Sequence, residues 1–246
     1  MTSSFWKFAN PHHFGKLVAA ITPILWVLSG FFILSGLGWG FFFTPDDYLQ
    51  GSTVKIIFVH VPSALIAINC WLVMLVSSLI WMVRRHRISI LVAKAAAPVG
   101  LSFTLVALVT GGLWGQPMWG TFWAWDPRLT SFLILFLHYI TYQLIWIYIS
   151  DKESAANISA LVCLIGSVFA LLSRYAINFW NQGLHQGATL SLDQDTNIHN
   201  VFYYPLILCI LGFVLLFVTL VLVRTKTEII HNQIKLNEKL GRKSNS

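Results

Sequence analysis

The chain has 246 residues, of which 57% are hydrophobic and 10% charged, and its mean hydropathy is +0.71. This composition excludes an ordinary water-soluble domain and indicates a polytopic membrane protein. The formal charge of +7 does not indicate a nucleic-acid partner, because the basic residues stand beside apolar runs, where lipid headgroups are the simpler partner.

Six apolar runs are long enough to cross a bilayer as helices, so the sequence predicts an all-α protein with six spans in a single membrane domain, residues 1–246. The first apolar run covers residues 17–43, with its helix expected to end near Trp39 or Gly40, and the third helix is expected from residue 90 or 95 to 113. The other predicted spans cover approximately residues 61–83, 129–150, 156–175 and 201–223. The first run is too long for the core of a signal peptide and lacks a cleavage site, so we interpret it as an uncleaved helix. Residues 224–246 form a basic tail after the last span.

Basic residues are shared unevenly between the two faces of this predicted bundle. Of the 16 Lys and Arg residues, 13 lie in the N-terminal segment, the loop after the second span, the turn after the fourth span and the tail. Only Lys55, Arg128 and Arg174 lie on the opposite face. The positive-inside rule therefore predicts cytoplasmic termini and places the loops after the first, third and fifth spans together on the outer face.

The three cysteines, Cys70, Cys163 and Cys209, lie deep in apolar runs and form no C-x-x-C pair. This pattern argues against a disulfide framework, a zinc site and covalently attached haem. We interpret all three as small buried side chains. No Walker A pattern occurs, so we do not expect the chain to bind ATP itself.

Residues 114–131, WGQPMWGTFWAWDPRLTS, form the outer loop after the third predicted span. Four of the eleven tryptophans lie here: Trp114, Trp119, Trp123 and Trp125. Glycine and proline break the segment too often for it to span a bilayer, so we expect it at the membrane surface, where an indole buries its ring and hydrogen-bonds through its N–H. An aromatic belt that only anchors helices is one interpretation. The density of indoles favours the other, a shelf for a large flat apolar molecule.

The spacing of Trp119, Trp123 and Asp126 predicts one face of a short helix between two prolines, lying flat in the headgroup layer. Asp126 followed by Pro127 also resembles a helix N-cap with proline at the first helical position. We therefore expect Asp126 to start the fourth span and shape the segment. The alternative is that its carboxylate holds Arg128 or an indole N–H.

Two histidines lie in the outer loops that flank this segment, His60 where the first outer loop meets the second span and His185 in the loop after the fifth span. Neutral imidazole is a good ligand for haem iron, and two opposed imidazoles make a six-coordinate site. Each His can instead be an interfacial residue that hydrogen-bonds a carbonyl or water. The aromatic segment favours iron ligation, because haem has two apolar faces to stack on. Arg128 suits either a haem propionate or an ordinary interfacial charge.

The remaining histidines offer weaker candidates. His138 lies inside the fourth predicted span and is either a buried ligand or a hydrogen-bonded core side chain. His86, His199 and His231 are interpreted as loop or tail residues. A di-haem cytochrome b would need paired histidines within the spans, so the sequence disfavours that class.

These residues resemble a known family. The matching positions are Trp114-Gly115, Trp119, Trp123, Trp125-Asp126 and Arg128-Leu129-Thr130. They are similar to the tryptophan-rich WWD signature, or WWD domain, of haem-handling membrane proteins. With six spans and one His in each flanking outer loop, the whole chain resembles the haem exporter protein C (CcmC) family of cytochrome c maturation.

The resemblance implies that the WWD loop transiently binds a non-covalent, b-type haem on the periplasmic face of the bacterial inner membrane. His60 and His185 would be the axial iron ligands. The residues around the haem would be Trp114, Trp119, Trp123, Trp125, Asp126 and Arg128. It further implies transfer of that haem to the membrane-anchored chaperone CcmE, helped by the small membrane protein CcmD. An ABC transporter of CcmA and CcmB would release the loaded chaperone. We expect a binding protein and not an enzyme.

The competing function is a transporter subunit that moves haem or another substrate across the bilayer. A transport path would need polar or ionisable residues within the spans. The predicted spans hold few, among them Asn69, His138 and Gln143. A purely structural subunit would leave the histidine pair and the dense tryptophans without a purpose.

Overall fold

The computed structural model describes residues 10–179 and 198–244. Within them lie 6 helices long and apolar enough to cross a membrane, and no strand. The helices are α1 (Pro11–Phe43), α2 (Ile57–Arg84), α3 (Arg87–Trp119), α4 (Pro127–Tyr148), α5 (Lys152–Phe179) and α6 (Asn200–Ser244). A short 3-10 helix, η2 (Ser52–Ile56), leads into α2. The predicted all-α class with six spans is confirmed.

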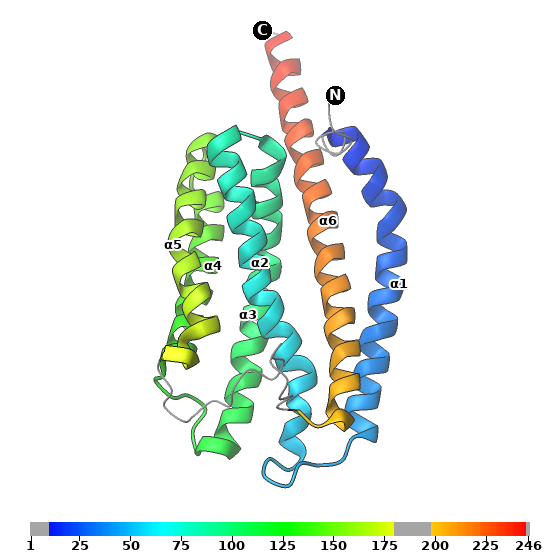
Figure 1. Ribbon diagram of the computed structural model, residues 1–246. Helices are drawn as coiled ribbons and strands as arrows, with labels where there is room; N and C mark the ends of the chain where they lie inside the picture. Colours follow the sequence, from blue (N-terminus) through cyan, green and yellow to red (C-terminus); the bar gives the residue numbers. More distant parts are fainter. Residues whose placement is uncertain (1–9, 180–197, 245–246) are drawn as a thin grey trace.

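The helices run alternately up and down, so the start of α1 and the end of α6 lie at the same end of the bundle (Figure 1). We call this the basic end, because it also holds the α2–α3 turn with its arginines and the α4–α5 turn. The opposite end, with η2, the α3–α4 connection and the start of α6, is the tryptophan end. The loops predicted to share one face do so where the structure describes them.

Several helices are longer than the sequence predicted. The third span was expected to end near residue 113, but α3 continues through Pro117 to Trp119. Proline removes one backbone N–H from the helix, and α3 tolerates this in its last turn. The second span was expected to begin at residue 61, but η2 passes directly into α2 at Ile57. The last span was expected to end at residue 223, but α6 continues as one helix through most of the predicted basic tail, to Ser244.

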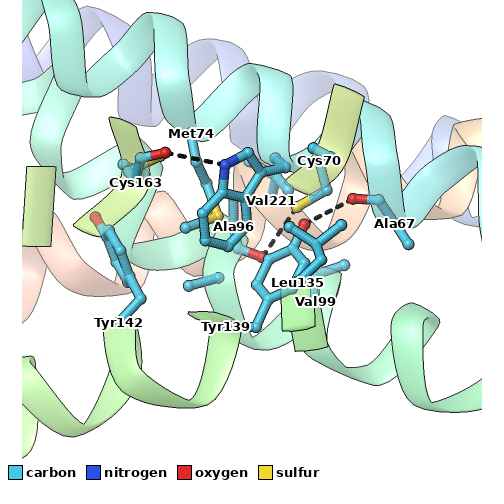
Figure 2. Packing of buried hydrophobic residues seen from close by; sticks show 14 of the residues in the cluster. Ala67, Cys70, Met74, Ala96, Val99, Leu135, Tyr139, Tyr142, Cys163 and Val221 are labelled. Carbon is cyan, nitrogen blue, oxygen red and sulfur yellow. Dashed lines mark hydrogen bonds between the residues drawn. The ribbon is translucent and has the colours of Figure 1, made fainter. Parts of the chain in front are cut away.

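The main core lies between α2, α3, α4 and α5, and two of its largest side chains, Trp71 and Tyr139, combine apolar packing with hydrogen bonds (Figure 2). The Trp71 and Tyr139 rings meet edge to face with centroids 4.6 Å apart. The indole N–H of Trp71 donates to the Cys163 carbonyl at 3.1 Å, and the Tyr139 hydroxyl donates to the Ala67 carbonyl at 2.7 Å. The three cysteines are buried and unpaired, as predicted.

The α1 helix packs mainly against α6, through glycines that let the two backbones approach closely. A Cβ atom on Gly36 would lie 2.7 Å from the Cys209 sulfur and 2.8 Å from its backbone nitrogen. A Cβ atom on Gly212 would lie 2.7 Å from the Ile33 backbone nitrogen. Small residues serve this purpose in membrane helix pairs, where packing replaces the hydrophobic effect as the source of association.

At the basic end, charged groups tie α6 to α3. The Lys94 ammonium lies 2.7 Å from the Glu228 carboxylate, and both side chains are largely buried. Lys94 also lies over the Trp146 ring of α4, 5.0 Å from its centroid. The Arg224 guanidinium donates from Nε to the Ala95 carbonyl at 3.1 Å. Each charge therefore has a partner, which offsets the cost of placing it beside the bilayer.

Candidate functional site

The tryptophan-rich segment is helical at both ends and irregular in the middle. The structure ends α3 at Gly120, which adopts the left-handed conformation with φ 74° and donates its N–H to the Gln116 carbonyl at 2.9 Å. Residues 120–126 form no helix, and α4 begins at Pro127. The predicted short helix carrying Trp119, Trp123 and Asp126 on one face is therefore wrong. Gly120 ends the preceding helix because glycine adopts this conformation without a Cβ clash.

Asp126 holds the start of α4, as the sequence predicted. Its carboxylate accepts a hydrogen bond from the Leu129 N–H at 2.6 Å, and Pro127 occupies the first turn. The residue is buried. A capping carboxylate also faces the positive end of the helix dipole, which stabilises both groups. The backbone direction of the whole segment is thus fixed at its C-terminal end.

The four tryptophans form two edge-to-face pairs. Trp114 and Trp119, on the last turns of α3, have ring centroids 5.2 Å apart. Trp123 and Trp125, in the irregular stretch, have centroids 5.6 Å apart. Trp125 is 75% exposed, whereas the Nε1 of Trp123 is buried and has no hydrogen-bond partner among the described residues. The segment therefore combines an accessible aromatic surface with a buried indole donor that can serve a further acceptor.

Trp114 joins the segment to the first outer loop. Its indole N–H donates to the side-chain oxygen of Gln50 at 2.7 Å. That loop is itself ordered, since the Asp47 carboxylate accepts from the N–H groups of Leu49 and Gln50, both at 2.9 Å. Two of the loops predicted to meet at one face are therefore in direct contact.

His60 lies in the first turn of α2 and is half-buried. Its Nδ1 is 3.0 Å from the hydroxyl oxygen of Thr110 on α3. Trp114 stands four residues after Thr110, one helical turn closer to the tryptophan end on the same face of α3. The structure thus brings His60 and the tryptophan segment together. His185, the other predicted ligand, lies outside the described residues.

Arg128 and Arg174 lie together at the tryptophan end of the α4–α5 hairpin. From the turn between these helices, Arg128 is about 30 Å back along α4 and Arg174 about 33 Å forward along α5. Both are half-buried, and the charge of Arg174 acts on Arg128, as does that of Asp126. In the described part of the chain, neither guanidinium forms an ion pair with a carboxylate. Two neighbouring cations of this kind suit a ligand with two carboxylates.

Among the remaining described histidines, only His199 lies at the same end of the bundle. His138 is in the interior of α4, where its Nδ1 is 2.8 Å from the Ile134 carbonyl and its ring packs against Trp71 and Phe169. Of the two interpretations that the sequence left open, the hydrogen-bonded core side chain fits this environment. His86 precedes α3, His199 precedes α6, and His231 is exposed on α6.

Sequence reasoning missed three residues that shape the site: Gln50, Thr110 and Arg174. Arg174 was recognised only as a cation on the outer face, although pairing α4 with α5 about their short turn would have placed it beside Arg128. Thr110 and Gln50 carry no comparable signal. Their roles depend on contacts across residues far apart in the chain.

The fold and this end of the bundle define a class of protein. It is a six-span membrane protein that gathers indoles, an imidazole and two guanidinium groups beside exposed aromatic side chains. These groups can stack on a flat apolar ligand, coordinate a metal through nitrogen and bind carboxylates. They are suited to haem.

Comparison with known proteins identifies the family. The family described as "Heme exporter protein C" matches residues 4–239. A protein named heme exporter protein C from Paracoccus denitrificans is 60% identical over 228 residues, covering 92% of this chain and 93% of that protein. The protein of that name from Rhodobacter capsulatus is 55% identical, with 97% and 99% covered. The protein of that name from Escherichia coli K12 is 36% identical, and the match covers 94% of this chain and 92% of that protein. The chain belongs to the heme exporter protein C family.

Proposed function

We propose that this protein binds haem at the tryptophan end and hands it to a membrane-anchored chaperone, CcmE, during the maturation of c-type cytochromes. The observation that carries the proposal is the position of His60. Its imidazole contacts Thr110, which lies on α3 one helical turn from Trp114. The printed name of the relatives, heme exporter protein C, agrees with haem as the cargo. The haem is a b-type group, held transiently and without a covalent bond.

Each group at the site has a role in holding this cargo. His60 and His185 would hold the iron through their imidazole nitrogens, and the periphery of the porphyrin would remain available for contact with aromatic side chains. The indoles of Trp114, Trp119, Trp123 and Trp125 supply the apolar contact. Arg128, beside Arg174, binds the propionates, and Asp126 keeps the segment and Arg128 in place.

The exposure of the aromatic surface supports hand-off over permanent storage. Trp125 is 75% exposed and Phe122 is 63% exposed, so a partner can reach the edge of a ligand held there. A cytochrome would enclose its haem, which slows release. We therefore propose a carrier that performs no chemical reaction and is not an enzyme. CcmD assists the transfer, and the ABC transporter of CcmA and CcmB releases the loaded chaperone.

The tryptophan end faces the periplasm in this proposal, and the protein resides in the bacterial inner membrane. The support is the charge distribution, with 13 of the 16 Lys and Arg residues in the segments assigned to the cytoplasmic face. A reporter fused after Ser246 should be cytoplasmic, and one inserted near Gln116 should be periplasmic. An external signal at Ser246 would contradict the assigned orientation.

The ligand assignment is tested by the absorption spectrum of the purified protein with haem. We expect a bis-imidazole spectrum that changes in His60→Ala and in His185→Ala, with little haem retained by the double variant. His199→Ala is the matched control, because His199 lies at the same end and is exposed. If the double variant kept the wild-type spectrum, the iron ligands would lie elsewhere.

A further inference from the structure

The hydroxyl group of Thr110 lies between carbonyl groups of its own helix and the His60 ring, and its contacts bear on which nitrogen of His60 carries a proton. The Thr110 oxygen is 2.7 Å from the Val106 carbonyl, 3.3 Å from the Ala107 carbonyl and 3.0 Å from His60 Nδ1. A carbonyl can only accept, whereas Nδ1 donates or accepts depending on the tautomer, and the geometry assigns the single hydroxyl hydrogen to Val106, the nearest acceptor. The hydroxyl oxygen then accepts, and Nδ1 of His60 is the donor. The neutral ring therefore has its lone pair on Nε2.

We propose that Thr110 is a positioning residue that fixes the tautomer and orientation of His60 for iron ligation through Nε2. This inference rests on the proposed haem-binding function and adds the residue that prepares its ligand. An imidazole that donates its other N–H to a fixed acceptor is oriented and is a more basic ligand. Because the Thr110 hydroxyl donates its hydrogen to the Val106 carbonyl within α3, its oxygen is held in one orientation. It can therefore accept the N–H of His60 in a fixed position.

The backbone beside Thr110 provides the space for the ring. A Cβ atom built on Gly111 would lie 3.0 Å from Cε1 of His60, closer than most side-chain contacts allow. The imidazole thus lies directly against the α3 backbone, with Thr110 bonding one of its nitrogens. Any larger residue at position 111 would push the ring away from that hydroxyl.

One turn after Thr110, the same face of α3 also contacts the segment that precedes α2. Trp114 holds Gln50 through its indole N–H at 2.7 Å. The Gln50 carbonyl in turn accepts from the Thr53 N–H at 3.3 Å, at the start of η2, which leads into α2. Thr110 therefore contacts His60 after the η2–α2 junction, and Trp114 holds Gln50 before it. The position of His60 in the first turn of α2 is fixed from both sides of that junction.

The tautomer can be measured directly in the haem-free protein. In protein labelled with nitrogen-15 at histidine, the two ring nitrogens of a neutral imidazole have well-separated shifts that show which is protonated. We expect His60, assigned by comparison with His60→Ala, to be Nδ1-protonated in the wild type and in Thr110→Ser. In Thr110→Val, which removes only the hydroxyl, we expect a mixture of tautomers. An Nε2-protonated wild-type ring would overturn the inference.

The consequence for ligation is measured on the haem-loaded protein. Thr110→Val should retain several-fold less haem, and the residual haem should have a more positive reduction potential, since a less basic imidazole stabilises ferric iron less. Thr110→Ser should restore both. Thr22→Val is the matched control, because Thr22 makes the same bond to the carbonyl four residues before it, on α1. Gly111→Ala should reproduce the loss of haem and the shift in reduction potential without altering the hydroxyl.

The outcomes separate this inference from the proposed function. If the wild type binds haem through His60 and Thr110→Val has an unchanged spectrum and potential, Thr110 has no positioning role. If the wild type binds no haem, the proposed function fails, while the nitrogen-15 measurement still decides whether Thr110 sets the tautomer. Should Thr110→Val fail to fold, Gly111→Ala, which displaces the ring from an intact hydroxyl, provides the same decision with Thr110→Ser as its control.

Discussion

The two ends of the bundle differ in the partners that their cationic side chains have. At the basic end, two partly buried cations have partners: Lys94 is paired with Glu228, and Arg224 donates to the Ala95 carbonyl. At the tryptophan end, Lys55 pairs with Asp46 at 3.1 Å, but Arg128 and Arg174 have no carboxylate partner among the described residues. We infer that Lys94 and Arg224 stabilise the fold, whereas Arg128 and Arg174 remain available to bind a ligand.

The aromatic groups differ in their arrangement. At the basic end, the ammonium of Lys94 lies over the Trp146 ring, 5.0 Å from its centroid. At the tryptophan end, four indoles form two edge-to-face pairs, and Trp125 is 75% exposed. Each end also has a buried indole nitrogen without a described hydrogen-bond partner, Nε1 of Trp146 and Nε1 of Trp123, so the clustering of the indoles and the cations beside them distinguish the tryptophan end. Substitutions at the tryptophan end should therefore affect haem, and those at the basic end should affect stability.

The largest effect is expected from removing two indoles. Each aromatic contact contributes roughly 0.5–1.5 kcal/mol beyond area burial, so Trp119→Ala with Trp123→Ala should weaken haem retention by about 5-fold to 150-fold. The residual haem should keep its bis-imidazole spectrum, because the iron ligands remain. Haem titration in detergent measures both. Normal retention and normal loading of the chaperone by this variant would mean that the segment only anchors the helices.

The next effect concerns the guanidinium pair. A hydrogen bond to a charged group is worth about 1.5–3 kcal/mol, so Arg128→Ala or Arg174→Ala should each weaken haem binding by roughly 10-fold, less where water screens the charge. Haem dimethyl ester, which lacks the carboxylates, should bind wild type and variants alike. An equal loss for haem and its ester would show that the arginines shape the site and do not contact propionates. Arg84→Ala, at the basic end, is the control.

A smaller effect on binding, but a measurable one on stability, is expected at the basic end. Lys94→Ala leaves Glu228 without its partner and should lower the free energy of unfolding by about 1–2 kcal/mol, since the pair is only partly exposed. Thermal unfolding in detergent measures this. Exchanging the two residues, Lys94→Glu with Glu228→Lys, should recover part of the loss. A change in the haem spectrum of Lys94→Ala larger than that of Arg174→Ala would break the division between the ends.

The smallest effect involves Asp151, at the α4–α5 turn. Hydrogen bonds from the Ser154 side chain and backbone lower the pKa of this carboxyl below its ordinary 3.8. A folded pKa below the unfolded one contributes stability above the unfolded value, and this is lost as the pH falls through the folded value. Asp151→Ala should therefore slightly lower the melting temperature at pH 7, and the difference from wild type should shrink as the pH falls past 3.8 and disappear below the lowered pKa of the folded protein. A difference that persists there would rule out the carboxylate as its cause.

The sequence alone determined the class, the number of spans and the cap at Asp126. These follow from local physics, because a run of apolar residues must form a helix in a bilayer and an aspartate before proline satisfies free N–H groups at a helix start. Local signals were weaker at the helix ends. Pro117 indicated a break, but one missing N–H costs little in the last turn, and Gly120 decided where α3 ends.

Only the tertiary structure decided which residues meet at the tryptophan end. His60 and Thr110 are 50 positions apart, and Trp114 and Gln50 are 64 apart, so no spacing pattern connects them. Helix packing in a membrane depends on which small and large side chains interlock across neighbouring helices, as Gly111 does with the His60 ring. The residue types at the site were therefore evident from the sequence, whereas the contact of His60 with Thr110 and the proximity of Arg128 and Arg174 required the packed bundle.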